Sequence, residues 1–308
     1  MSRMLEQHIR THGGVATWTQ LTADVPPHVV KTAVVSGRLV RLLPRVYADP
    51  RRSGERDIRL RAALLFAGPG SALSHLTALE QWPRLRLSRE DIVHVMTPID
   101  RDRRSTGFVV VHRHGDRLLP ADAVIERNGL PVIRAAPSLV DSWSILPATA
   151  RRGPVIEAVS IGLVQAPEIG DIARSRASLR GRAELLRLIA LLDAGCRSEL
   201  EILGFRTIFS RARLPKAEWQ FSVVIDGHRL VLDVAWPRLL IAVELDGAAY
   251  HTSRAARERD LQRDAALTRA GWVVVRLSYR RVLQEPQAIV AELAEIIRTR
   301  TAQLGAMP

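Results

Sequence analysis

The chain of 308 residues is long enough for two or three domains with hydrophobic cores of their own. Its composition, 47% hydrophobic and 25% charged, is typical of folded globular domains and excludes a chain that is disordered throughout. A formal net charge of +13 favours polyanionic partners, with nucleic acid first and an anionic membrane surface second.

The first fifty residues have the pattern of a small helical unit followed by a hairpin. We predict a helix at 4–11, a second helix that Thr17 caps and that runs through Ala23, and a third at 28–36 that Pro27 opens. Two short strands are expected on either side of a turn at Pro44. Three helices and a hairpin predict a winged helix-turn-helix in residues 1–50.

Residues 51–150 predict a mixed α/β domain. Helices are expected at 58–66, 72–81 and 139–146, and strands at 92–96 and 108–112. Residues 151–182 carry helical signals broken by proline and glycine, so we expect a linker of connecting helices there.

The pattern is clearest from residue 183 onward. Helices are expected at 183–194, 198–211, 253–269 and 286–304, and strands at 219–225, 230–236, 239–245 and 272–277. Asp226-Gly227 predicts a tight hairpin between the first two of these strands.

Counting outward from the two expected turns gives the faces of this sheet. Gln220 is expected opposite Asp233, and Asp233 opposite Ala242. Because opposed and alternate residues share a face, one face is expected to be polar: Gln220, Ser222, Val231, Asp233, Ala235, Ala242, Glu244 and Asp246. The other is expected to be a packing face: Leu230, Leu232, Val234, Trp236, Leu239, Ile241, Val243 and Leu245.

The clustered acids on the polar face predict a metal site. Asp233 and Glu244 would be diagonal neighbours, about 7–8 Å apart at Cα, so both carboxylates can reach one cation. Mg²⁺ (or Mn²⁺) suits such a pair, since it accepts one or two carboxylates, and it would activate a water at a phosphodiester. The alternative is a solvent-facing sheet with scattered acids.

The same residues resemble a known family. The motif residues are Val231-Leu232-Asp233, Ile241 through Gly247, His251, Asp260, Arg263-Asp264, Leu267 and Gly271 through Arg276. In order and spacing they resemble domain of unknown function family 559, which is similar to the very-short-patch-repair endonucleases of the PD-(D/E)XK nuclease superfamily. The match covers roughly residues 198–293, and it implies a restriction-endonuclease-like α/β sheet domain in residues 183–308.

The resemblance implies roles for particular residues. Asp233 and Glu244 match the metal-binding acids, while Asp246 stands where many relatives carry the motif lysine. The last lysine of the chain is Lys216, so the phosphate charge would have to be met by Arg263 or His251.

Two further polar residues are assigned to this site. Glu201 matches a glutamate on the first helix of the superfamily, and Gln220 would orient substrate or water. Ser198-x-x-Glu201 is also a capping box, in which Glu201 would bind the Ser198 backbone N–H instead, and the two interpretations stay open.

The N-terminal half resembles the AbiEi-type antitoxin architecture over roughly residues 5–146. The motif residues are Gly13-Gly14-Val15-Ala16, Gly37 through Arg41, Val46-Tyr47, Ser74-His75, Thr77-Ala78, His112-Arg113, Gly129-Leu130-Pro131 and Leu139-Val140-Asp141. The resemblance implies a winged helix that binds DNA, and it is consistent with a partner from a toxin–antitoxin or defence system. The fold class expected for the whole chain is therefore multidomain α+β.

Basic residues support DNA contact by the winged helix. Eight arginines stand against three acids between Arg38 and Arg61. Arg38, Arg41 and Arg45 would lie on the wing and hold phosphates, while His28 and Lys31 would lie on the recognition helix. The alternative is a solvated basic face. We expect structural roles for His75, His94, His112 and His114, because their spacing fits no helical or hairpin ligand set.

The sequence leaves two main functions open. The first is a Mg²⁺-dependent DNA endonuclease or nicking enzyme that the winged helix delivers to duplex DNA. The second is an antitoxin-like transcriptional regulator whose nuclease fold is inactive, which the absent motif lysine favours. An RNA-directed nuclease is a weaker third reading, and the oligomeric state is left open.

Location and redox chemistry follow from what the sequence lacks. Cys196 is the only cysteine, so an intrachain disulfide and a cysteine-based zinc site are excluded, and we expect an inert small side chain there. The first residues lack a secretory apolar core, and the longest apolar runs are too short to cross a bilayer. We therefore expect a cytoplasmic protein.

Overall fold

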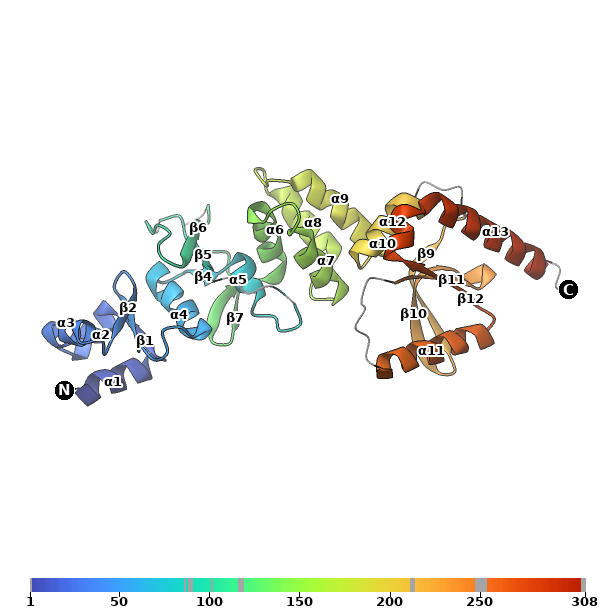
Figure 1. The fold of residues 1–308 in the computed structure, drawn as a ribbon. Helices are drawn as coiled ribbons and strands as arrows, with labels where there is room; N and C mark the ends of the chain where they lie inside the picture. The colour runs from blue at the N-terminus through green and yellow to red at the C-terminus, as the bar shows by residue number, and fades with distance from the viewer. Residues whose placement is uncertain are drawn as a thin grey trace. The chain divides into compact units, whose positions relative to one another are not determined.

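The protein is described by a computed structural model (Figure 1). It describes residues 2–85, 87, 91–100, 102–115, 119–210, 214–246 and 254–305. The chain divides into two compact units, residues 1–182 and 183–308. Across the described residues, the helices are all too short or too polar to cross a lipid bilayer.

The first unit begins with three helices and a three-stranded antiparallel sheet of order β1-β3-β2. The elements are α1 (Ser2–Thr11), β1 (Val15–Thr17), α2 (Trp18–Asp24), α3 (Pro27–Val35), β2 (Val40–Leu43) and β3 (Val46–Ala48). The three helices and the hairpin expected from the sequence are confirmed, whereas β1 was not foreseen. Its three residues are too few to show a period, and it forms only by pairing with β3. The assignment as a winged helix stays a prediction.

Local chemistry explains where α2 begins. The Thr17 hydroxyl accepts a hydrogen bond from the Gln20 backbone N–H at 3.2 Å, and the Gln20 amide oxygen accepts from the Thr17 N–H at 2.8 Å. This reciprocal cap satisfies two backbone groups that a helix start otherwise leaves unpaired. The helix then buries Leu21 in a core shared with Val30 of α3 and Leu5 of α1.

A five-stranded mixed sheet of order β6-β5-β4-β8-β7 forms the middle of the first unit. Its elements are α4 (Arg56–Ala67), β4 (Ala72–Leu73), α5 (His75–Leu79), β5 (Val93–Thr97), β6 (Val109–Arg113), β7 (Val124–Arg127), β8 (Leu130–Ile133) and α6 (Ala135–Ile145). The single helix expected at 72–81 is wrong. Leu73 pairs with both Val95 and Val132, so this segment is a central strand, and the helix begins only at His75.

Two helices fill the segment expected to be a linker, α7 (Arg152–Ser160) and α8 (Ala166–Ser175). They bury apolar faces that include Val155 and Ile169. Helix α8 packs on α6, so this part of the chain is built into the first unit.

The second unit carries a four-stranded sheet of order β12-β11-β10-β9, in which only β11 and β12 are parallel. Its elements are α9 (Arg182–Asp193), α10 (Glu199–Gly204), η1 (Phe205–Phe209), β9 (Glu218–Ile225), β10 (His228–Trp236), η2 (Pro237–Leu239), β11 (Ile241–Asp246), α11 (Arg254–Arg269), β12 (Val273–Ser278), α12 (Tyr279–Gln284) and α13 (Pro286–Gly305). The continuous helix expected at 198–211 is wrong, because its second half is the π-helical turn η1. Helix α12 was not foreseen.

Figure 1 shows α11 on one side of this sheet and α10, α12 and α13 on the other. The core under α13 contains Val243, Leu277 and Leu293, whereas the core under α11 contains Ala242 and Leu267. Successive strand residues therefore alternate between two buried faces, as they do in a sheet covered on both sides.

Two turns set the register of β9, β10 and β11. Asp226 and Gly227 both have positive φ, 51° and 78°, which is the backbone of the tight hairpin expected there. The next turn is longer than expected, since 237–240 form a 3₁₀ turn that ends with Leu240 at φ 52°. Ala242 consequently pairs with Ala235, and the expected pairing of Asp233 with Ala242 is wrong by two residues.

The alternation of faces breaks in the middle of the hairpin. Trp219 packs under α13 but Phe221 packs under α11, because Gln220 between them has left-handed backbone with φ 49°. Across the ladder, Val234 and Leu232 likewise lie on opposite faces. The expectation that Leu230 and Leu232 share the packing face of Val234 is therefore wrong, because both pack under α11.

Candidate functional site

Glu201 lies in the first turn of α10 and is only 5% exposed. Its Oε2 accepts hydrogen bonds from the Arg197 backbone N–H at 2.9 Å and from Gln220 Nε2 at 3.0 Å. Ser198 caps the helix by accepting from the Glu201 N–H at 3.1 Å. Half of the expected capping box is thus present, but the carboxylate binds Arg197 rather than Ser198. Burial raises the pKa of Glu201 above its ordinary value.

Asp233 and Glu244 come together from adjacent strands. The ladder pairs Val234 with Val243, so the same register continued by one residue places Asp233 opposite Glu244. Asp233 is half-buried, and its Oδ2 accepts a hydrogen bond from the Leu245 backbone N–H at 2.8 Å. The two residues are therefore opposed rather than diagonal, and the negative charge of Asp233 acts on the Glu244 carboxyl.

The electrostatics of Glu244 are strained. The residue is 5% exposed, and burial raises the pKa of its carboxyl to about 7. The positive charge of Arg263 lowers this pKa, whereas the negative charge of Asp233 raises it further. Burial likewise raises the pKa of Asp233. Carboxyl groups with raised pKa values at one place are typical of functional sites, because a fold rarely buries acids without a use for them.

Arg263 of α11 reaches directly into this group. Its Nη2 donates to Glu244 Oε1 at 2.8 Å and to the Val231 backbone carbonyl. The sequence placed Arg263 at the phosphate, and the structure brings it to the carboxylates. His251, the other residue expected there, lies outside the described residues.

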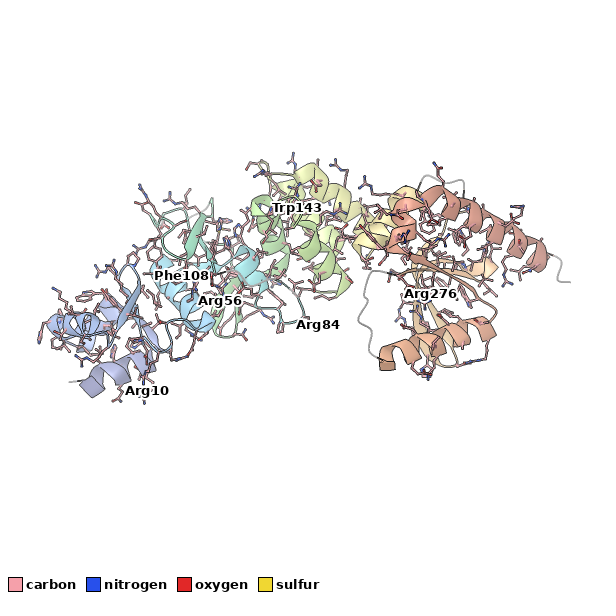
Figure 2. The ribbon with its side chains drawn as sticks, viewed as in Figure 1. Arg10, Arg56, Arg84, Phe108, Trp143 and Arg276 are labelled. Carbon is pink, nitrogen blue, oxygen red and sulfur yellow. The ribbon has the colours of Figure 1, made fainter. Side chains whose placement is uncertain are left out.

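Arg276 of β12 is a site residue that the sequence analysis did not single out. It lies beside Glu244 in the parallel ladder, and its charge opposes the rise in the pKa of that carboxyl. Arg276 is labelled in Figure 2 among the elements of the second unit. Its guanidinium binds Asp246 Oδ1 at 3.1 Å and Asp264 Oδ1 at 2.8 Å. Asp246 is exposed at the end of β11. Only the parallel pairing of β11 with β12 reveals this contact, which no spacing in the sequence indicates.

Asp233 and Glu244 offer the hard oxygen ligands that Mg²⁺ and Mn²⁺ prefer. A cation between them would relieve the repulsion and desolvation that raise their pKa values. Among the described residues, however, the acids do not form a set of three whose ligand atoms all lie within 4.8 Å. Binding would therefore require the Arg263 guanidinium to loosen from Glu244.

The five residues expected to contact DNA are all exposed, in the first unit: His28 and Lys31 on α3, Arg41 on β2, and Arg38 and Arg45 in the adjoining turns. Arg45 has left-handed backbone with φ 61°, at the tip of the hairpin between β2 and β3. A cavity of about 560 Å³ beside this region is lined by Arg10, Arg38, Arg51 and Arg52 among others. Asp49 also lines this cavity, and two of its arginines are paired with acids, Arg51 with Asp49 and Arg52 with Glu55. Exposed basic side chains of this kind suit a polyanion.

Cys196 was expected to be an inert small side chain. Cys196 is buried, and burial raises its thiol pKa to about 12, so a reactive thiolate is disfavoured at neutral pH.

His75, His94 and His112 were expected to have structural roles, and the structure brings the three side chains together. Their elements are far apart in the sequence, so spacing could not reveal the cluster.

A comparison with protein families bears on the second unit. The family model described as REase_MTES_1575, a restriction-endonuclease-like family, matches residues 210–297. The matched segment contains Asp233, Glu244 and Arg276, so the second unit contains a nuclease-like domain.

Relatives that match most of the chain occur in Mycobacterium tuberculosis. "Uncharacterized protein MT2308" of strain CDC 1551 / Oshkosh and "Uncharacterized protein Rv2248" of strain H37Rv are each 26% identical over 270 residues, which is 85% of this chain and 93% of theirs. Among solved structures, the crystal structure of RV2827C protein from the same species matches with TM-score 0.41 and 16% identity, over 61% of this chain and 76% of that chain.

Proposed function

We propose that the protein is a metal-dependent DNA endonuclease or nicking enzyme of the very-short-patch-repair-like type, delivered to duplex DNA by an N-terminal winged helix. One observation carries the proposal: Asp233 and Glu244, both with raised pKa values, converge inside the segment that matches a restriction-endonuclease-like family. The donor set selects Mg²⁺ or Mn²⁺ rather than a softer metal.

Each residue of the carboxylate site has a proposed role. When bound, the cation would lower the pKa of a water and stabilise charge on the phosphodiester. Asp233 and Glu244 would hold it through their carboxylates. Gln220 fixes the orientation of Glu201 by its hydrogen bond of 3.0 Å, which places a second, buried acid beside Asp233.

Arginine takes the place of the missing motif lysine. In the structure Arg263 pairs with Glu244 at 2.8 Å. With Glu244 engaged as a metal ligand, the Arg263 guanidinium would be available to contact the phosphate. Its planar guanidinium can bind two phosphate oxygens at once, which a lysine cannot. Arg276 holds Asp246 and Asp264 and thereby keeps the end of β11 in place beside α11.

The proposal is tested by titrating Mn²⁺ into the full chain by calorimetry and assaying plasmid nicking on the same preparation. Saturable binding with nicking that a chelator abolishes is expected. If the protein binds neither Mn²⁺ nor Mg²⁺ and nicks no DNA, the proposal that it is a nuclease is wrong.

The pairing of Arg263 with Glu244 also supports a second function, that of a DNA-binding regulator whose nuclease fold is inactive. The Arg263–Glu244 pair already neutralises the buried acid, and Asp246 stands in the lysine position, as expected for an inactive nuclease fold in an antitoxin-like regulator. This reading predicts metal-independent footprinting on the DNA upstream of its own gene. A footprint that requires Mg²⁺, or that survives removal of residues 1–50, would count against it.

DNA delivery by the first unit gives a further prediction. Replacing both Arg41 and Arg45 by Gln should weaken binding to random duplex DNA. It should also reduce the magnitude of the slope of log affinity against log salt concentration by about 2, because each lost phosphate contact lowers that magnitude by roughly 0.9. Fluorescence anisotropy over a salt series measures this.

Arg298→Gln on α13 is the control, since it removes one exposed arginine that is paired with Glu295 on its own helix. An unchanged slope in the double variant would exclude the wing as a phosphate contact. So would an equal change in the control.

A further inference from the structure

Three histidines of the first unit converge from three elements of the five-stranded sheet region. His75 begins α5 directly after β4, His94 lies on β5, and His112 lies on β6, which pairs in parallel with β5. One ring nitrogen from each lies within 4.8 Å of the other two. The rings of His75 and His112 stack at 3.7 Å between centroids.

The hydrogen bonds determine which nitrogens face one another. His94 Nδ1 and His112 Nε2 are 2.9 Å apart. The Ser74 hydroxyl binds His75 Nδ1 at 3.0 Å, which leaves Nε2 as the ligand atom of that ring. A second partner that holds the non-ligating nitrogen and so orients the ring is what metal-bound histidines have.

The three rings are largely shielded from water. His75 and His94 are 4% and 6% exposed, and His112 is half-buried. Burial first, and then the charge of neighbouring histidines, lowers the pKa of His75 to about 2 and that of His112 to about 4. Neutral imidazole is the species that binds a metal.

Backbone strain marks the same residue. His75 has φ 51°, in the left-handed region that a residue with a side chain adopts at some cost. This conformation turns the chain from β4 into α5, and it places the His75 ring against those of His94 and His112. Strain of this kind persists where the surrounding structure demands it, and functional sites are where it gathers.

We propose that His75, His94 and His112 form a binding site for one divalent transition metal ion, Zn²⁺ above all, in the first unit of this protein. Imidazole selects such ions over Mg²⁺ and Ca²⁺. In a tetrahedral Zn²⁺ site with bonds of about 2.0–2.1 Å, ligand nitrogens lie about 3.3 Å apart, so the His94 and His112 nitrogens, now at 2.9 Å, would separate slightly. The stacked rings would also tilt, because the lone pair that binds a metal lies in the plane of the ring. Three protein ligands leave the fourth position for water or for an exogenous anion. This site is separate from the carboxylates of the second unit.

The test uses the untagged full chain, stripped by a chelator and titrated with Zn²⁺ by calorimetry. One Zn²⁺ per chain is expected. Co²⁺ put in its place should give the strong visible absorption of a tetrahedral site, and X-ray absorption at the zinc edge should show nitrogen ligands from imidazole. A chain that binds no Zn²⁺, or one whose bound zinc has only oxygen ligands, would overturn the proposal without any variant.

Variants then locate the ion. His112→Gln should weaken Zn²⁺ binding at least roughly tenfold, since even loss of a group behind a ligand costs that much. His228→Gln removes an exposed histidine from the hairpin of the second unit and should leave binding unchanged, as should Asp233→Asn. Zinc binding that His112→Gln leaves intact, or that Asp233→Asn removes, would refute the histidine site. Circular dichroism without zinc confirms that His112→Gln is folded, and the zinc-edge spectrum of the wild type decides the question if it is not.

Discussion

Asp233→Asn should lose at least roughly a hundredfold in plasmid nicking and most of its affinity for Mn²⁺, while binding of duplex DNA is retained. The amide has the shape of the carboxylate and can still accept the hydrogen bond from the Leu245 N–H, so the strand pairing should survive. It lacks the charge that a divalent cation requires. Loss of a group that merely orients a metal ligand costs about 10–100-fold, so loss of a ligand itself should cost more.

The matched control is Asp226→Asn in the same unit. Asp226 is exposed in the hairpin turn, where Asn-Gly is as favourable as Asp-Gly. Its nicking rate should equal that of the wild type. Equal loss of nicking and DNA binding in Asp233→Asn would show a folding defect, and undiminished nicking would remove Asp233 from the mechanism.

Without divalent cations, the second unit should lose about 3 kcal/mol of stability as the pH rises from about 4.5 to 7. The pKa of Glu244 is about 7 in the folded chain against an ordinary value of 4.5, so the folded state holds this proton more tightly than the unfolded state. Stability from such a group is complete at low pH and is lost as the pH passes through the folded pKa. Asp233 and Glu201, whose pKa values are also raised, act in the same direction.

Hydrogen exchange of the β10 and β11 amides, measured with chelator and then with Mn²⁺ from about pH 4.5 to 8, checks the prediction. Mn²⁺ should restore protection at pH 8 and have little effect at pH 5, because it competes with protons for the carboxylates. Glu244→Gln should flatten the pH dependence, whereas the exposed Glu218→Gln should not. If the stability of the wild type rises steadily from pH 4.5 to 7, the raised pKa of Glu244 is contradicted.

Local patterns in the sequence determined much of the second unit. Alternating apolar residues located β9, β10 and β11, and Asp226-Gly227 specified their first turn, because both depend only on neighbours in the chain. Mid-strand acids at Asp233 and Glu244 stood out for the same reason, since strands disfavour them. Thr17 and Pro27 located the starts of two helices in the first unit by the chemistry of helix caps.

The tertiary structure decided what depends on pairing between distant segments. The turn at 237–240 moved the register by two, and the left-handed Gln220 reversed the faces of Leu230 and Leu232. Neither follows from composition, because a strand residue adopts positive φ only when its surroundings compensate for the strain.

The partners of the buried charges were decided in the same way. Arg263 and Arg276 reach Glu244 and Asp246 only after α11 and β12 have packed on the sheet. The histidine cluster is the clearest case, because His75, His94 and His112 meet through strand pairing and no periodicity relates them. Sequence by itself determined most of the strands and long helices of the second unit and which acids are unusual, and packing alone determined which charged and ligating groups share a site.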